Sequence, residues 1–179
     1  MPRSTLATAL AAVCLAALTL PACSPTLDWR EARLGGQVQL VIPCKPDRIE
    51  RELDLAGAKA QALMVVCDAD GVSWSATRFE LGDPARGEPA LRELRYKLAQ
   101  NIGGEERRVE AQLPGPPAHD ARRSQLSGKR PGGASVRAEA LFFGESSRVY
   151  QVVAILPADA RPALVDQATQ FLDGVHLAR

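Results

Sequence analysis

The sequence predicts a domain of the α+β class, in which helices cover the faces of a sheet. Several segments alternate apolar and polar residues, as half-buried strands do, and two others carry apolar residues at helical spacing. A late segment, 147–156, is apolar on both faces. Because a strand that is buried on both faces needs cover on both sides, we expect helices or loops across each face of this sheet.

The N-terminal segment from Met1 to Ser24 resembles a bacterial lipoprotein signal. Its apolar run, Leu6 to Leu20, is shorter than the roughly 20 residues that span a bilayer as a helix. The lipobox of such signals has Leu three residues before an invariant Cys and a small residue just before that Cys. Leu20, Ala22 and Cys23 match this pattern.

This signal predicts the place of the protein in the cell. We expect a signal peptide over 1–22, a lipidated Cys23 in a short tether over 23–28, and a single α+β domain over 29–179. By resemblance to lipoprotein sorting rules, Ser24 favours the outer membrane over the inner membrane, with the domain facing the periplasm. Lipid chains on Cys23 would anchor the protein stably in that membrane. Ordinary secretion and an uncleaved membrane anchor are the alternatives.

The composition argues against nucleic-acid partners. The chain holds 22 Lys and Arg against 21 Asp and Glu, so its formal net charge is +1 at pH 7, and aromatic residues make up 4%. A general polyanion binder carries a strong basic excess, and a stacking platform for bases or sugars needs aromatic side chains. The sequence offers neither feature.

The first half of the domain predicts four strands. Residues 37–43 and 49–55 alternate apolar and polar side chains, and the apolar-rich runs 59–67 and 72–81 follow them. Between the last two runs, Asp70-Gly71 is a strong hairpin signal. The alternative for this stretch is a fragment of a calcium loop, which needs further oxygen ligands and a distant Glu that the sequence does not supply in register.

The cysteines leave one pair in the mature domain. Cys14 is lost with the signal peptide and Cys23 carries lipid, so Cys44 and Cys67 remain in a compartment where disulfides persist. If their strands are neighbours, a bridge is geometrically reasonable and would contribute roughly 3 kcal/mol. Two buried thiols are the alternative, and a redox function would lack a C-x-x-C motif.

The middle of the domain predicts a helix over 88–103, which Gly103-Gly104 ends. Its apolar stripe consists of Leu91, Leu94, Leu98 and Ile102. We expect this stripe to pack on the sheet of the same domain. A helix lying on a membrane surface is the alternative.

The next segments are a strand over 105–113 and the most irregular part of the chain, 114–133. Basic residues gather in the irregular part: Arg122, Arg123, Lys129 and Arg130. They are candidates for contact with an envelope partner, with lipid headgroups or with acidic wall polymers, because long irregular loops often carry function. A solvated loop or a polar edge strand is the alternative.

Two strands and a helix close the domain. The strands cover 134–143 and 147–156 and are joined by a tight turn. Apolar residues at helical spacing between Leu164 and Leu172 predict the helix, with Asp159 as its cap and Gly174 as its stop.

No recognisable catalytic or metal-binding motif occurs in the sequence. The histidines, His119 and His176, have no metal-ligand partner at helical or finger spacing, and Gly144–Arg148 breaks the nucleophile-elbow pattern at its final Gly. Phosphate-cradling and dinucleotide-binding loops do not occur in the sequence. We therefore expect no cofactor, no metal and no enzymatic activity, and a hydrolase is the least favoured hypothesis.

The order of elements resembles small PsbP-like proteins, as do many uncharacterised proteobacterial lipoproteins. The likeness rests on the strand ending at Pro43, the Asp70-Gly71 hairpin, the helix ending near Asn101-Ile102-Gly103, and the closing segments 149–153 and 171–177. It covers about Trp29 to Leu177. The resemblance implies a central antiparallel sheet with helices packed on its faces and a non-enzymatic role, and it carries over no functional residue.

We therefore expect a membrane-anchored, periplasm-facing lipoprotein with a non-catalytic binding or assembly role and an envelope protein as partner. A carrier of a small apolar ligand or lipid is the alternative. A deep apolar pocket would be the sign of such a carrier.

Overall fold

The computed structural model describes residues 27–35, 37–111, 113 and 118–177. The predicted signal peptide, Cys23 and all but the end of the predicted tether lie outside the described residues. Within these ranges, no helix combines the length and apolar character that a membrane crossing requires.

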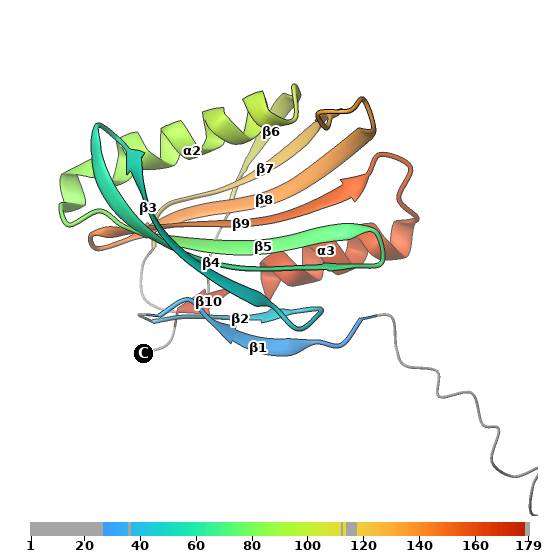
Figure 1. Cartoon of the computed structure of the whole chain (residues 1–179), viewed down its shortest axis with the longest axis horizontal. Helices are drawn as coiled ribbons and strands as arrows, with labels where there is room; N and C mark the ends of the chain where they lie inside the picture. The colour runs from blue at the N-terminus through green and yellow to red at the C-terminus, as the bar shows by residue number, and fades with distance from the viewer. Residues whose placement is uncertain (1–26, 36, 112, 114–117, 178–179) are drawn as a thin grey trace, which may run out of the picture.

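Most of the domain is one antiparallel sheet. Its strands are β3 (Asp47–Leu55), β4 (Ala58–Ala69), β5 (Val72–Glu80), β6 (Glu105–Glu110), β7 (His119–Lys129), β8 (Ser135–Glu145) and β9 (Arg148–Pro157). They lie in the order β3-β4-β5-β9-β8-β7-β6, so the pairing of β5 with β9 joins the two halves of the chain (Figure 1). The predicted Asp70-Gly71 hairpin between β4 and β5 is confirmed, and both turn residues have the positive φ that such a turn requires.

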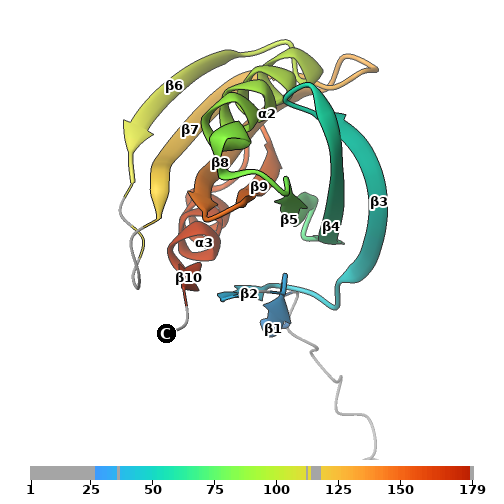
Figure 2. The same cartoon turned by 90° about the vertical axis from the view of Figure 1, so that its left-hand side faces the viewer.

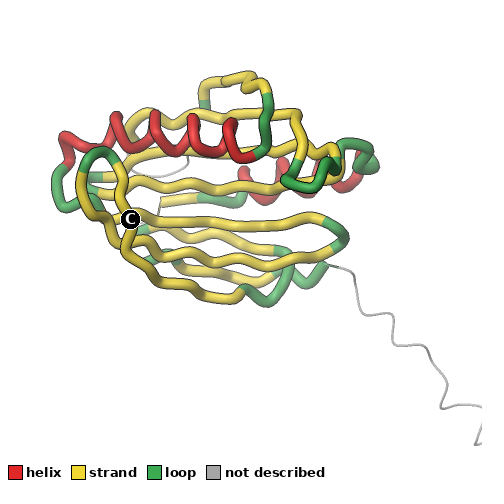
Figure 3. Tube along the Cα trace, turned by 45° about the horizontal axis from the view of Figure 1, so that its top comes forward, coloured by secondary structure: helices red, strands yellow, loops and turns green. Residues whose placement is uncertain are grey.

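In the described part of the chain, a smaller sheet, two α-helices and a short 3-10 helix complete the fold. The small sheet has the order β1-β2-β10, with β1 (Arg30–Arg33), β2 (Val38–Ile42) and β10 (His176–Leu177). The α-helices are α2 (Gly87–Asn101), which follows the short 3-10 helix η2 (Pro84–Arg86), and α3 (Pro162–Asp173). The α+β class is therefore confirmed, but Figure 3 shows that strands far outweigh helices.

The large sheet is covered on both faces, as the doubly apolar segment 147–156 predicted. Alternate residues of β9 belong to two separate cores. Tyr150 and Val152 pack with α3 and the small sheet, whereas Val149 and Val153 pack with α2. Figure 2 shows the large sheet curving around α2, with β6 and β7 on one side of the helix and β3 on the other.

The prediction of an irregular loop over 114–133 was wrong for residues 119–129. These residues form β7, which pairs with β6 on one side and with β8 on the other, so it is an interior strand. The sequence of β7 is too polar to predict a strand, because only Ala121, Ser124 and Leu126 are buried among its described side chains. Strand β1 escaped prediction for the same reason, since only Ala32 of its residues is buried.

The predicted cap of the last helix was also wrong. Arg161, not Asp159, occupies the N-cap position of α3, and its side chain makes no capping hydrogen bond. Pro162 opens the helix, because its fixed φ suits the first helical position and its missing N–H is not needed there. The predicted stop is confirmed, since Gly174 is the C-cap and its N–H donates to the Gln170 carbonyl.

Candidate functional site

A groove of about 250 Å³ lies between α2 and the curved edge formed by β3, β4 and β5. Its lining is mostly apolar and consists of Ile49, Arg51, Leu53, Leu55, Ala62, Met64, Ser75, Thr77, Phe79, Leu94, Lys97, Leu98, Asn101 and Gln151. Ligand sites typically enclose roughly 300–1,000 Å³, so this groove suits part of one slender molecule rather than a bulky one.

Strand register builds the floor and the outer wall of the groove. Successive strand residues point to opposite faces, so every second residue of β3, from Ile49 to Leu55, faces α2. Two rows then run across the strands. One row contains Arg51, Ala62 and Phe79, and the other contains Ile49, Met64, Thr77 and Gln151.

The helical wall comes from one stripe of α2. Leu94, Lys97, Leu98 and Asn101 recur three or four residues apart and therefore share a face of the helix. Leu94 and Leu98 belong to the stripe that the sequence predicted to pack on the sheet, and both are buried. The predicted packing of this helix on the domain's own sheet is thus confirmed.

One end of the groove is closed because the β3–β4 turn is fixed to the start of the helix. The Arg86 guanidinium donates to the carbonyls of Leu55 and Ala58 in the hairpin, and to that of Leu81 after β5. The Ala56 N–H donates to Glu93 on α2 at 2.8 Å. Leu55, at this end, is only 1% exposed.

The other end of the groove is open to solvent. Ile49, near the start of β3, is 39% exposed, whereas Phe79 on the floor is 5% exposed. Lys97 on the helical wall keeps half of its side chain exposed. Exposure therefore rises along the groove from Leu55 toward Ile49, which locates the mouth.

An ion pair on α2 joins Lys97 of the helical wall to Glu93, which lies toward the closed end of the groove. Lys97 Nζ lies 2.5 Å from a carboxylate oxygen of Glu93. Hydrogen bonds from Lys97 and from the Ala56 N–H hold the pKa of Glu93 below its usual value, against the opposing effect of burial. Glu93 is therefore ionised at neutral pH and keeps the β3–β4 turn on the helix.

A second cleft lies over β6, β7 and β8 and has a different character. It measures about 420 Å³ and its lining includes Glu105, Arg107, Arg137 and Glu139. Glu139 is buried but paired with Arg137 at 2.6 Å. Arg107 donates to the Gln125 side chain at 3.1 Å, and the lining as a whole carries charges of both signs, so this cleft selects no ligand class. Among the described residues, no group of His, Cys, Asp and Glu side chains could hold a metal ion.

The basic residues predicted as a contact loop are not brought together. Arg122 and Arg123 lie on opposite faces of β7, and Arg123 forms an ion pair with Asp173 at the end of α3. Lys129 is at the far end of this strand, about 23 Å from Arg122 along an extended chain. Arg130 follows the strand and donates to Ser73 at 3.2 Å. The predicted role of these residues as partner contacts stays a prediction.

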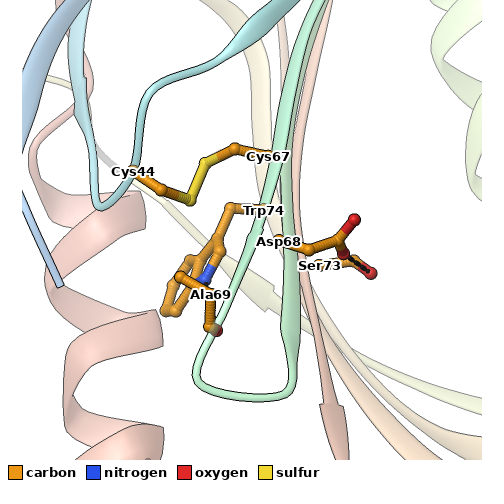
Figure 4. The surroundings of a disulfide bond; sticks show 6 residues. All are labelled: Cys44, Cys67, Asp68, Ala69, Ser73 and Trp74. Carbon is orange, nitrogen blue, oxygen red and sulfur yellow. Dashed lines mark hydrogen bonds between the residues drawn. A yellow bond between two sulfur atoms is a disulfide. The ribbon is translucent and has the colours of Figure 1, made fainter. Parts of the chain in front are cut away.

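The predicted Cys44–Cys67 disulfide is confirmed. The two Cα atoms lie 6.0 Å apart, and the bridge joins the segment that follows β2 to β4. Figure 4 shows it beside Trp74, whose indole N–H donates to the Ala69 carbonyl at 3.3 Å. The bridge thus ties the small sheet to the large one in the core and has a structural role.

The groove itself was not predicted from the sequence. The sequence places on apolar faces the residues Leu53, Leu55, Leu94 and Leu98, but nothing in their spacing indicates that those faces leave space between them.

His176, one of the two histidines considered for catalysis, lies in β10 with its ring nitrogen 3.1 Å from the Gly174 carbonyl. The side chain of His119 lies outside the described residues.

Comparisons with known proteins add a distant structural likeness. No protein-family model and no curated protein matches this chain. A crystal structure of PA94, a protein of unknown function from Pseudomonas aeruginosa, is similar with a TM-score of 0.42 and 15% sequence identity. The match covers 81% of this chain and 94% of that one. A likeness this low assigns neither family nor function.

Proposed function

We propose that this protein is a membrane-anchored, periplasm-facing lipoprotein that binds one slender apolar ligand in the groove between α2 and β3, without catalysis. The groove is the observation that carries the proposal. Its floor and walls are largely apolar, and it is closed at Leu55 and open at Ile49. A single alkyl chain has this shape, since it can enter at the mouth and end at Leu55.

The energy available in the groove supports binding of a short stretch of chain. Each buried methylene contributes about 0.8 kcal/mol, so four or five of them provide about 3–4 kcal/mol toward binding. This corresponds to a gain of more than a hundredfold in affinity before the costs of ordering the chain. The envelope protein partner expected from the sequence stays a prediction, because no feature of the described surface singles out such a partner.

The proposed anchor would keep the groove close to a lipid source. Leu27, the first described residue, is four positions after Cys23 in the sequence. An extended chain spans at most about 3.6 Å per residue, so these residues allow a separation of only about 14 Å. A lipidated Cys23 would therefore hold the domain against the membrane surface.

We expect Cys23→Ala to release the protein from the membrane fraction, because it removes the proposed site of lipid attachment. The protein would be fractionated from cells with and without detergent, and its N-terminal peptide analysed by mass spectrometry. Cys14→Ala is the matched control and should remain in the membrane fraction, since that residue lies in the predicted signal peptide. Retention of the Cys23→Ala protein in the membrane would contradict the anchor.

We expect Thr77→Trp to weaken binding of an apolar ligand at least tenfold, because the indole would occupy the floor of the groove. Displacing two methylenes is enough for this, at about 0.8 kcal/mol each and 1.4 kcal/mol per tenfold. The measurement is fluorescence titration with phenylnaphthylamine, a neutral apolar probe. Thr169→Trp adds the same bulk to an exposed position of α3 and should bind as the wild type does. Equal binding by all three proteins would place the probe elsewhere and overturn the proposal.

A further inference from the structure

The ionisable side chains that line the groove carry charge of one sign only. Among all its lining residues, the ionisable ones are Arg51 on β3 and Lys97 on α2. They come from opposite walls, so a group that enters the mouth passes between two cations.

Strand alternation separates Arg51 from the acidic residues of its own strand. Glu50, Glu52 and Asp54 point to the opposite face of β3 from Arg51. Each has a partner on that face: Glu50 pairs with Arg48, Glu52 accepts from Gln61 at 2.8 Å, and Asp54 pairs with Lys59 at 3.2 Å. Within the described part of the chain, Arg51 forms no ion pair or side-chain hydrogen bond.

The acidic group next to Lys97 is already engaged. Glu93 pairs with Lys97 and also accepts the Ala56 N–H. It offsets one of the two cations, which leaves the positive charge of Arg51 uncompensated beside an apolar groove. A ligand with a neutral head would leave the Arg51 charge unpaired, whereas an anionic head would form an ion pair with it.

We propose that the ligand of this groove is a single-chain amphiphile with an anionic head group, a carboxylate or a phosphate, held between Arg51 and Lys97 while its chain runs toward Leu55. This inference rests on the proposed function, because it names the ligand class of the same groove. The head binds at the solvent-exposed mouth and the chain binds among Leu53, Phe79 and Leu94.

The test compares ligands that share one chain and differ in the head. Laurate, lauroyl lysophosphatidate and dodecanol, each below its micelle-forming concentration, would displace phenylnaphthylamine from the full-length protein in detergent-free nanodiscs. Because the cations are exposed, we expect at least one anionic ligand to bind about three- to tenfold more tightly than dodecanol. Whichever anion binds more tightly identifies the head as carboxylate or phosphate.

Matched variants test whether the preference for anionic ligands arises from the two cations of the groove. The double variant Arg51→Gln/Lys97→Gln should lose the preference for the anions, so that its affinities for the anions and for dodecanol become equal. Arg48→Gln removes a cation from the opposite face of the same strand and should keep the preference. Equal binding of all three ligands by the wild type would overturn the head-group assignment and leave the groove proposal intact. Failure of every ligand to displace the probe would overturn both.

Discussion

Replacing Trp74 with alanine is expected to lower the free energy of unfolding by about 3–5 kcal/mol, the largest effect of any single substitution considered. The side chain is 0% exposed and lies where the large sheet, the small sheet and α3 meet. Its ring makes edge contacts with Trp29 at 6.3 Å and with Phe171 at 5.4 Å between centroids. Alanine would leave a cavity that these rings cannot fill without moving.

Urea unfolding followed by circular dichroism measures this loss. The matched control is Tyr96→Ala, which removes an aromatic ring that is 62% exposed on α2. Surface changes of that kind usually alter stability by no more than about 0.5 kcal/mol. A loss below about 1 kcal/mol for Trp74→Ala would mean that the three elements do not share one core.

Removing the Cys44–Cys67 bridge is expected to lower stability by about 3 kcal/mol, because the unfolded chain gains the freedom of the loop that the bridge closes. The cysteines are separated by 23 positions, a loop long enough for an effect of this size. For a chain of this length, each kcal/mol shifts the melting temperature by about 2–4 °C, so the expected decrease is about 6–12 °C.

The double variant Cys44→Ala/Cys67→Ala, compared with wild type with and without reductant, provides the measurement. Reduced wild type should melt near the temperature of the variant, and the variant should not respond to reductant. An unchanged melting temperature in both comparisons would contradict a stabilising role for the bridge. The test is independent of the groove, since neither cysteine lines it.

Local sequence patterns predicted those elements whose turn residues or apolar spacing lie within a single short segment. The Asp70-Gly71 turn requires positive φ, and the leucine stripe of α2 requires a helical period, so neither depends on distant contacts. Apolar residues on both faces of β9 predicted that other elements pack against both faces of the sheet. Strand β7 carried no such signal, because its pairing with β6 and β8 is made by the backbone while its side chains are largely polar.

The candidate site could not be predicted from the sequence for a different reason. Arg51 and Lys97 belong to a strand and a helix that are separated by two further strands, and neither residue differs in the sequence from any other surface cation. Only the curvature of the sheet around α2 brings them to the same opening. The basic residues that did stand out, Arg122 to Arg130, are distributed by β7 over both of its faces and both of its ends.

The sequence by itself determined the α+β class, the Asp70-Gly71 hairpin, the two helices and the pair of cysteines available for a bridge, because each follows from periodicity or composition within a short segment. Only the tertiary structure decided the order of the strands, the interior place of β7, the closure of the groove by Arg86 and Glu93, and the two cations at its mouth. These features arise where elements distant in the chain meet, and their geometry depends on register and sheet curvature rather than on local propensity.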